Sequence, residues 1–109
     1  MAWGLTTHVL DTAHGQGAGG MRVALRQIEP ESGLLAEVVL DTSGRANLLD
    51  ADALVPGVYE LLFEVGEYYR TVAGFLGQVP VRFRVAEAGL HYHVPLIVSP
   101  FGYSTYRGG

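Results

Sequence analysis

The sequence contains no cysteine among its 109 residues. A disulfide framework and a thiolate nucleophile are therefore both excluded, and a chain that is 49% hydrophobic can bury a core without such cross-links. No stretch approaches the roughly 18 consecutive apolar residues of a membrane helix. The first residues also lack the basic and apolar regions of a signal peptide. We therefore expect a cytoplasmic protein that does not associate with a membrane.

Positive charge is also scarce, because seven basic residues face eleven acidic ones and the net charge is −4. The basic residues are scattered, whereas neutralising a nucleic-acid backbone requires clusters of them, so we expect no nucleic-acid partner. The apolar content excludes wholesale disorder. The length predicts a single domain over residues 1–109.

Apolar residues recur with a period of two along most of the chain, which is typical of half-buried strands. In the segment 57–65, Tyr59, Leu61 and Phe63 share one face, with Glu60 and Glu64 on the other. The segments 21–28 and 81–87 repeat this alternation, and 34–40 is more continuously apolar. Turns rich in Gly, Pro, Asp and Ser separate the segments. The pattern predicts an all-β sandwich or barrel.

One segment departs from this alternation, and another resembles a nucleotide-binding motif. In 67–75, Tyr68, Val72 and Phe75 recur at helical spacing, which predicts one short helix. The loop 14–20 contains a formal G-x-G-x-x-G, but an alternating strand follows it, whereas a dinucleotide fingerprint opens a helix. We expect this loop to bind no nucleotide, and its His14 to be exposed and without function.

Three of the four histidines lie in or beside predicted strands. The apolar residues of HYHVPLIV form one face, which predicts a core position for Tyr92, Val94, Leu96 and Val98. His91 and His93 then point to the opposite face, with Pro95 and Ile97. In GLTTHVLD, Leu5 and Val9 share the expected core face, which leaves His8 on the other side with Thr6 and Leu10.

A sheet face that carries histidines among apolar residues such as Leu10 and Ile97 is more typical of an interface or a pocket than of open solvent. This pattern predicts oligomer formation, with a site at or near a subunit contact. A purely structural role for each histidine remains an alternative. A metal site is another, because His-x-His places both rings on one face, but no carboxylate lies in that stretch and we expect no metal. By themselves, Arg45 is a surface residue after a turn and Arg107 belongs to a polar tail.

Four stretches together resemble one family: LTTHVLDTAHGQGAGG, DTSGR, HYHVPLIVSP and YSTYRGG. The chain is similar to the 5-hydroxyisourate hydrolases, transthyretin-related enzymes of urate breakdown, from about Leu5 to its last residue. The resemblance implies a transthyretin-like sandwich of two four-stranded antiparallel sheets with one short helix. It also implies a homotetramer, a dimer of dimers, with active sites at the dimer–dimer interface.

The resemblance further implies that His8, Arg45 and His93 are catalytic. It implies that the terminal segment closes the site, with Arg45 and the last four residues binding substrate: Tyr106, Arg107, Gly108 and Gly109. The family usually ends in Ser where this chain has Gly109. No cofactor is implied.

The implied reaction is hydrolysis of a cyclic amide-type C–N bond in 5-hydroxyisourate, which gives 2-oxo-4-hydroxy-4-carboxy-5-ureidoimidazoline in purine catabolism. Without a thiol, direct attack by water is the simplest route, and an imidazole is a suitable base near neutral pH. We hypothesise that one of the two histidines takes the proton and that Arg45 stabilises the oxyanion. The alternatives are a transthyretin-like carrier of a small ligand, without catalysis, and a hydrolase of a related cyclic amide.

Overall fold

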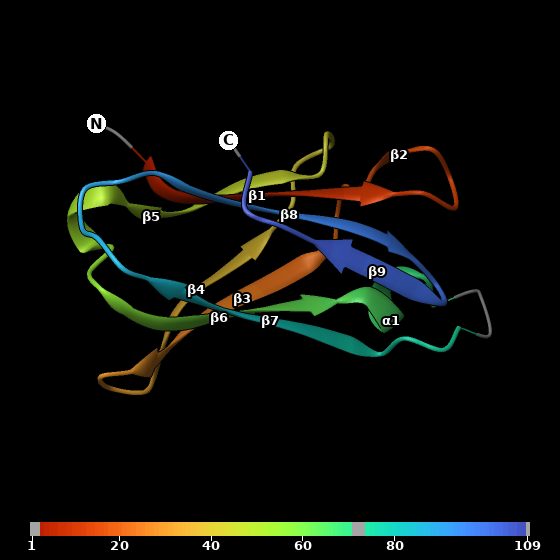
Figure 1. Ribbon diagram of the computed structural model, residues 1–109. Coiled ribbons are helices and arrows are strands. Elements are labelled where there is room, and N and C mark those ends of the chain that lie inside the picture. The colour runs from red at the N-terminus through yellow and green to blue at the C-terminus, as the bar shows by residue number, and fades with distance from the viewer. Residues whose placement is uncertain (1–2, 71–73, 109) are drawn as a thin grey trace.

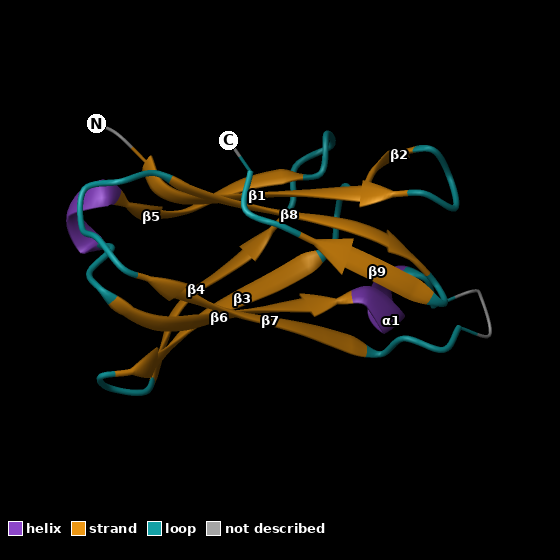
Figure 2. Ribbon diagram, in the orientation of Figure 1, coloured by secondary structure: helices purple, strands orange, loops and turns teal. Residues whose placement is uncertain are grey.

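The computed structural model describes residues 3–70 and 74–108, which form two β-sheets packed face to face (Figure 1). The first sheet contains β1 (Trp3–Asp11), β2 (Gln16–Gly17), β5 (Arg45–Asp50), β8 (Tyr92–Ser99) and β9 (Gly102–Thr105). The second contains β3 (Arg22–Glu29), β4 (Gly33–Val39), β6 (Gly57–Glu64) and β7 (Gln78–Val85). Two short helical turns, η1 (Ala51–Ala53) and α1 (Val65–Tyr68), lie at opposite ends of the sandwich (Figure 2).

The strand β1 is the centre of the first sheet. It runs parallel to β8 along one edge, and it pairs on its other edge with β5 and then with the two-residue β2. The sheet is therefore four strands wide although five strands contribute to it. The second sheet is antiparallel throughout, in the order β4-β3-β6-β7. The expected transthyretin-like sandwich is confirmed, with β2 and the parallel β1–β8 pair as details that the sequence had not predicted.

The core lies between the sheets and is formed by the faces that the alternation predicted. In β6 and at its end, Tyr59, Leu61, Phe63 and Val65 are all fully buried. On the facing sheet the buried residues include Leu5, Val9, Tyr92, Val94, Leu96 and Val98. Fixing these residues inside directs every intervening side chain of β1 and β8 outward, because neighbouring residues of a strand point to opposite faces.

The expected helix is present but begins earlier than the spacing of Tyr68, Val72 and Phe75 had indicated. It covers Val65–Tyr68 and continues directly from β6. Phe75 lies in a non-helical segment and is 78% exposed, and Val72 is outside the described residues. The backbone N–H groups of Phe75 and Leu76 both donate to the carbonyl of Pro100, 3.0 Å away. These hydrogen bonds tie Phe75 and Leu76 to the β8–β9 turn.

A buried carboxylate joins the end of β1 to the helix. Asp11 is 1% exposed and accepts hydrogen bonds from the hydroxyls of Tyr68 and Tyr69, from His14 Nδ1 and from two backbone N–H groups. Burial raises the pKa of Asp11, but the hydrogen bonds from Tyr69, Tyr68 and His14 together outweigh it and lower this pKa below its ordinary value. Burial and the Asp11 carboxylate raise the pKa of Tyr68 to about 12. His14 is exposed, as expected, and its ring also supports the Asp11 cluster, a structural contact that the sequence had not predicted.

None of the helices within residues 3–70 and 74–108 has the length and apolar character needed to span a membrane.

Candidate active site on the outer face of the first sheet

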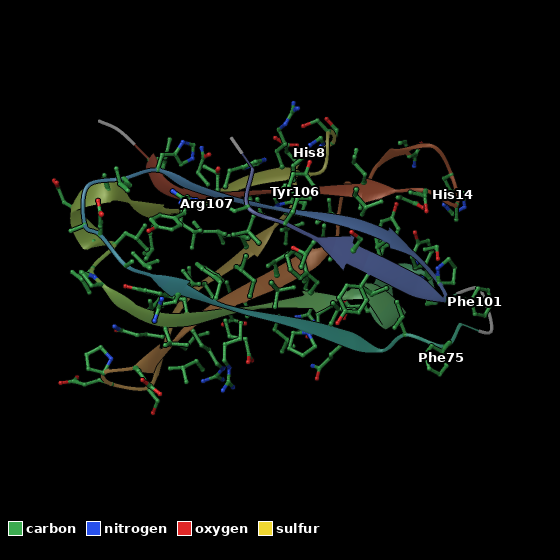
Figure 3. All side chains as sticks on the ribbon, in the orientation of Figure 1. His8, His14, Phe75, Phe101, Tyr106 and Arg107 are labelled. Carbon is green, nitrogen blue, oxygen red and sulfur yellow. The ribbon has the colours of Figure 1, made fainter. Side chains whose placement is uncertain are left out.

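The pairing of β1 with β5 and β8 gathers the three predicted catalytic residues on the outer face of the first sheet. In the parallel β1–β8 pair, His93 lies opposite Thr6, and His8 is two residues further along β1. In the antiparallel β1–β5 pair, Arg45 lies opposite His8. Both histidines are partly buried and Arg45 is exposed. Figure 3 shows His8 on the side of this sheet that faces away from the second sheet.

The turn 41–44 holds the His8 ring in place. Its Nε2 lies 3.1 Å from the carbonyl oxygen of Ser43. A carbonyl only accepts hydrogen bonds, so Nε2 carries the proton and donates. In neutral His8 the lone pair is then on Nδ1, which leaves that nitrogen available to a substrate or a water.

Asp41 fixes the shape of this turn. Its Oδ1 accepts hydrogen bonds from Ser43 N at 2.9 Å, from Ser43 Oγ at 2.6 Å and from Arg45 N at 3.1 Å. The Ser43 hydroxyl and the Arg45 backbone N–H lower the pKa of Asp41, because both stabilise its charged form. One carboxylate thus positions both the acceptor of His8 and the start of β5.

Two glycines let other segments pass close to this turn. A Cβ on Gly17 would lie 1.9 Å from the carbonyl oxygen of Ser43. Gly44 has φ of +82°, and a Cβ there would lie 2.5 Å from the carbonyl oxygen of Val9. Gly17 of the G-x-G-x-x-G stretch therefore serves the packing of β2 against the His8 turn.

His93 is held on two sides. Its Nδ1 lies 2.8 Å from the hydroxyl of Thr6, and its carbonyl accepts a 2.7 Å hydrogen bond from the backbone N–H of Gly108. Burial lowers the pKa of His93 below its usual 6.5, and the positive charges of His91, His8 and Arg45 lower it further. At neutral pH the His93 imidazole is therefore uncharged and can accept a proton.

Residues of the terminal segment contact both faces of the first sheet, the outer face that carries the histidines and the face toward the core. Gly108 packs against the ring of His93, so closely that a Cβ at this position would lie 2.5 Å from Cδ2. Arg107 instead places its guanidinium over the ring of Tyr92, 4.1 Å from the centroid, on the core side of β8. Tyr106 and Arg107 border a groove of about 240 Å³ beside β7. Gly109 lies outside the described residues.

Three residues that orient the histidines were not predicted as site residues: Thr6 contacts His93 through its hydroxyl, Ser43 accepts from His8 through its carbonyl, and Asp41 fixes the turn that carries Ser43. Thr6 alternates with His8 on the same face, which was its only signal in the sequence. His14 lies beyond the end of β1, away from His8 (Figure 3). Within the described residues, no group of three or more His, Asp or Glu side chains is arranged to hold a metal ion.

Comparison with known proteins identifies close relatives of the chain. Residues 5–108 match the HIUase/Transthyretin family. The chain is 44% identical to a 5-hydroxyisourate hydrolase 2 of Rhizobium meliloti over 113 aligned positions, which cover 95% of this chain and 94% of the relative. It superposes on the Klebsiella pneumoniae 5-hydroxyisourate hydrolase with a TM-score of 0.84 and 33% identity, and each chain is covered completely. It also superposes on an (S)-allantoin synthase with a TM-score of 0.90 and 40% identity, where it spans 99% of its own length but 44% of that longer chain.

Proposed function

Because the chain belongs to the HIUase/Transthyretin family, we propose that it is a hydrolase that opens the ring of 5-hydroxyisourate in purine catabolism. The observation that carries this function is the convergence of His8, Arg45 and His93 on one sheet face, in a chain whose relatives are named 5-hydroxyisourate hydrolases. The product is 2-oxo-4-hydroxy-4-carboxy-5-ureidoimidazoline, formed by addition of one water across the broken C–N bond.

In the proposed mechanism His93 is the general base. Its lowered pKa keeps the ring neutral at pH 7, and its Nδ1 is engaged by Thr6, so Nε2 is the nitrogen that takes a proton from the attacking water. The water oxygen bonds to the ring carbonyl carbon, and the C–N bond then breaks. The proton passes to the leaving nitrogen, either from His93 or through Nδ1 of His8, whose Nε2 is tied to Ser43.

Arg45 is the proposed partner of the developing oxyanion. Its guanidinium is permanently charged and offers five N–H donors in a planar fork. A donor aimed at the negative charge of the transition state contributes about 10²–10³-fold in rate. Its place opposite His8 across the β1–β5 pair supports this role.

We further propose that the active form is a cytoplasmic homotetramer with its active sites at the dimer–dimer interface. Leu10 is 39% exposed beside His8, and Ile97 is partly exposed near His93. A second copy over this face would bury these apolar side chains. Light scattering after size exclusion measures the assembly, and a monomer would contradict it.

Residues 106–109 are the remaining substrate contacts in this proposal, although Tyr106 and Arg107 border the groove beside β7 and would have to turn toward the histidines to reach a substrate. The hydrogen bond from Gly108 to His93 supports a position at the border of the site. Arg107 anchors the segment through its contact with the Tyr92 ring.

The direct test generates 5-hydroxyisourate from urate with urate oxidase and follows the decay of its transient absorbance. We expect decay well above the spontaneous rate, and a loss of about 100-fold or more in His8→Ala, Arg45→Ala and His93→Ala. His14→Ala and Arg26→Ala are matched controls, because both remove the same residue types away from this face and should stay active.

The same assay separates the alternatives. A carrier would bind 5-hydroxyisourate analogues without accelerating its decay. A hydrolase of a related cyclic amide would open a panel of hydantoins or ureides faster than 5-hydroxyisourate. The neutral His93 beside Arg45 favours hydrolysis over carriage, because a hydrophobic carrier needs neither group.

A further inference from the structure

A single hydroxyl lies between two histidines at the start of β8. Thr6 Oγ1 is 2.8 Å from His93 Nδ1 and 2.9 Å from His91 Nε2. No direct hydrogen bond joins the two imidazoles, whose ring centroids are 6.4 Å apart and tilted by 58°. His91 immediately precedes β8 and is exposed, whereas Thr6 and His93 are partly buried. The hydroxyl is therefore the link between a ring in solvent and the ring proposed as the base.

We propose that Thr6 relays the protonation state of His91 to His93 and so decides which nitrogen of His93 is free to act as the base. This inference rests on the proposed function only in naming His93 as the base. Thr6 and His91 are positioning residues, because both act through His93.

The Thr6 hydroxyl carries a single hydrogen. Thr6 can donate to one ring and accept from the other. Accepting from both rings at once would leave its hydrogen without an acceptor among the described residues, which costs one hydrogen bond. The two paired arrangements are therefore favoured, and they have opposite consequences for His93.

In the first arrangement His91 is neutral and accepts the Thr6 hydrogen at Nε2. Thr6 then accepts from His93 Nδ1–H, which places the lone pair of His93 on Nε2. No described group hydrogen-bonds to that nitrogen, so it is free to take a proton from water. This is the active arrangement.

In the second arrangement His91 carries a hydrogen on Nε2, and protonation of the ring enforces this because both its nitrogens are then donors. Its Nε2–H donates to Thr6, and the Thr6 hydrogen turns to His93 Nδ1. The proton of neutral His93 then sits on Nε2, and the remaining lone pair is occupied by Thr6. Protonation of an exposed ring thus disables a base that it does not contact.

The charged and titratable groups that act on His93 are His91, His8 from β1 and Arg45 from β5. All three are cationic or become so on acidification, and none is an acid that would reverse the effect. Acidification therefore makes His93 a less effective base, both through the added positive charge and through the relay.

The first test compares Thr6→Val, which removes the hydroxyl, with Thr6→Ser, which keeps it. Nitrogen-15 NMR of the His93 ring above pH 7 reports its tautomer without requiring activity. We expect mainly Nδ1–H in the wild type and in Thr6→Ser, and a mixture of tautomers in Thr6→Val. In the decay assay we expect kcat of Thr6→Val to fall a few-fold, in proportion to the fraction of the inactive tautomer, with little change in KM.

Thr12→Val is the matched control for a lost hydroxyl. Thr12 donates to a backbone carbonyl of β8 at 3.0 Å, away from the histidines. The Thr12→Val protein should lose some stability but keep the wild-type kcat and the wild-type His93 tautomer. A Thr6→Val protein with the wild-type tautomer and wild-type kcat would overturn the relay.

The second test uses His91→Gln, in which the side-chain oxygen accepts from Thr6 but does not titrate. We expect the acid limb of its kcat/KM profile to move to lower pH. The limb should also depend on one titrating group fewer than in the wild type. An unchanged acid limb would also overturn the relay. If the wild type itself fails to accelerate 5-hydroxyisourate decay, the proposed function is wrong, while the NMR comparison still decides the relay.

Discussion

Replacing Gly108 by Ala places a methyl group against the proposed base. The Cβ would lie 2.5 Å from His93 Cδ2, 3.2 Å from Cγ and 3.3 Å from Cβ. Non-bonded carbons prefer separations of about 3.5–4.0 Å, so the ring or the terminal segment must move by roughly 1 Å. Gly108 does not occupy the left-handed region, so the backbone itself accepts Ala and the conflict is purely steric.

Both ways of relieving this conflict disturb the site but leave the core intact. If the ring turns, His93 loses its alignment, and a misplacement of about 1 Å costs about 10²-fold in rate. If the terminal segment lifts, the hydrogen bond from Gly108 N to His93 O breaks, which costs about 1 kcal/mol of unfolding free energy. We therefore expect kcat/KM to fall about 100-fold while the unfolding free energy changes by about 1 kcal/mol.

The assay is the decay of 5-hydroxyisourate formed by urate oxidase, combined with urea unfolding of the same preparation. Gly102→Ala is the matched control, because a Cβ at Gly102 would meet nothing within 4 Å. It should keep both activity and stability. Wild-type kcat/KM in Gly108→Ala would refute the reasoning, because it would mean that the contact with the His93 ring has no bearing on catalysis.

Three further predictions follow from the same geometry. Gly17→Ala should lower both kcat/KM and the melting temperature, because its Cβ would lie 1.9 Å from the Ser43 carbonyl that holds His8; normal kinetics would contradict this. Asp11→Asn should cost about 2–3 kcal/mol of unfolding free energy in urea titrations at pH 7. That cost should shrink as the pH falls below the ordinary 3.8 and through the lowered folded-state pKa, because the carboxylate is then protonated. In His91→Gln, where residue 91 no longer titrates, the acid limb of kcat/KM should have its midpoint below 6.5, because burial and neighbouring positive charge keep His93 neutral to lower pH; a midpoint at or above 6.5 in that variant would count against His93 as the base.

The pattern of the sequence was sufficient for the long strands β1, β3, β4, β6, β7 and β8 and for the side of each that enters the core, but it predicted neither β2 nor β9. Period-two alternation placed Tyr59, Leu61 and Phe63 inside and directed His8 and His93 outward, and the structure confirms both. The α1 helix was placed too late, because the contact of Phe75 and Leu76 with Pro100 is a long-range contact that local spacing does not contain.

The residues of the candidate site could be predicted one by one, but their arrangement in space could not. His8, Arg45 and His93 were identified through motifs, since the alternation says which face a residue takes but not which strands are neighbours. The parallel β1–β8 pair connects segments more than 80 residues apart and decides that Thr6, not another hydroxyl, meets His93.

The sequence by itself determined the all-β class, the core faces and the residue types available for catalysis, because side-chain alternation and turn chemistry are local properties of the chain. Only the tertiary structure decided that His8 is tied through Nε2 to Ser43, that Gly108 lies against His93 and that Arg107 stacks on Tyr92. Ring orientation and pKa depend on burial and on charges contributed by several strands. Those strands become neighbours only when the chain folds.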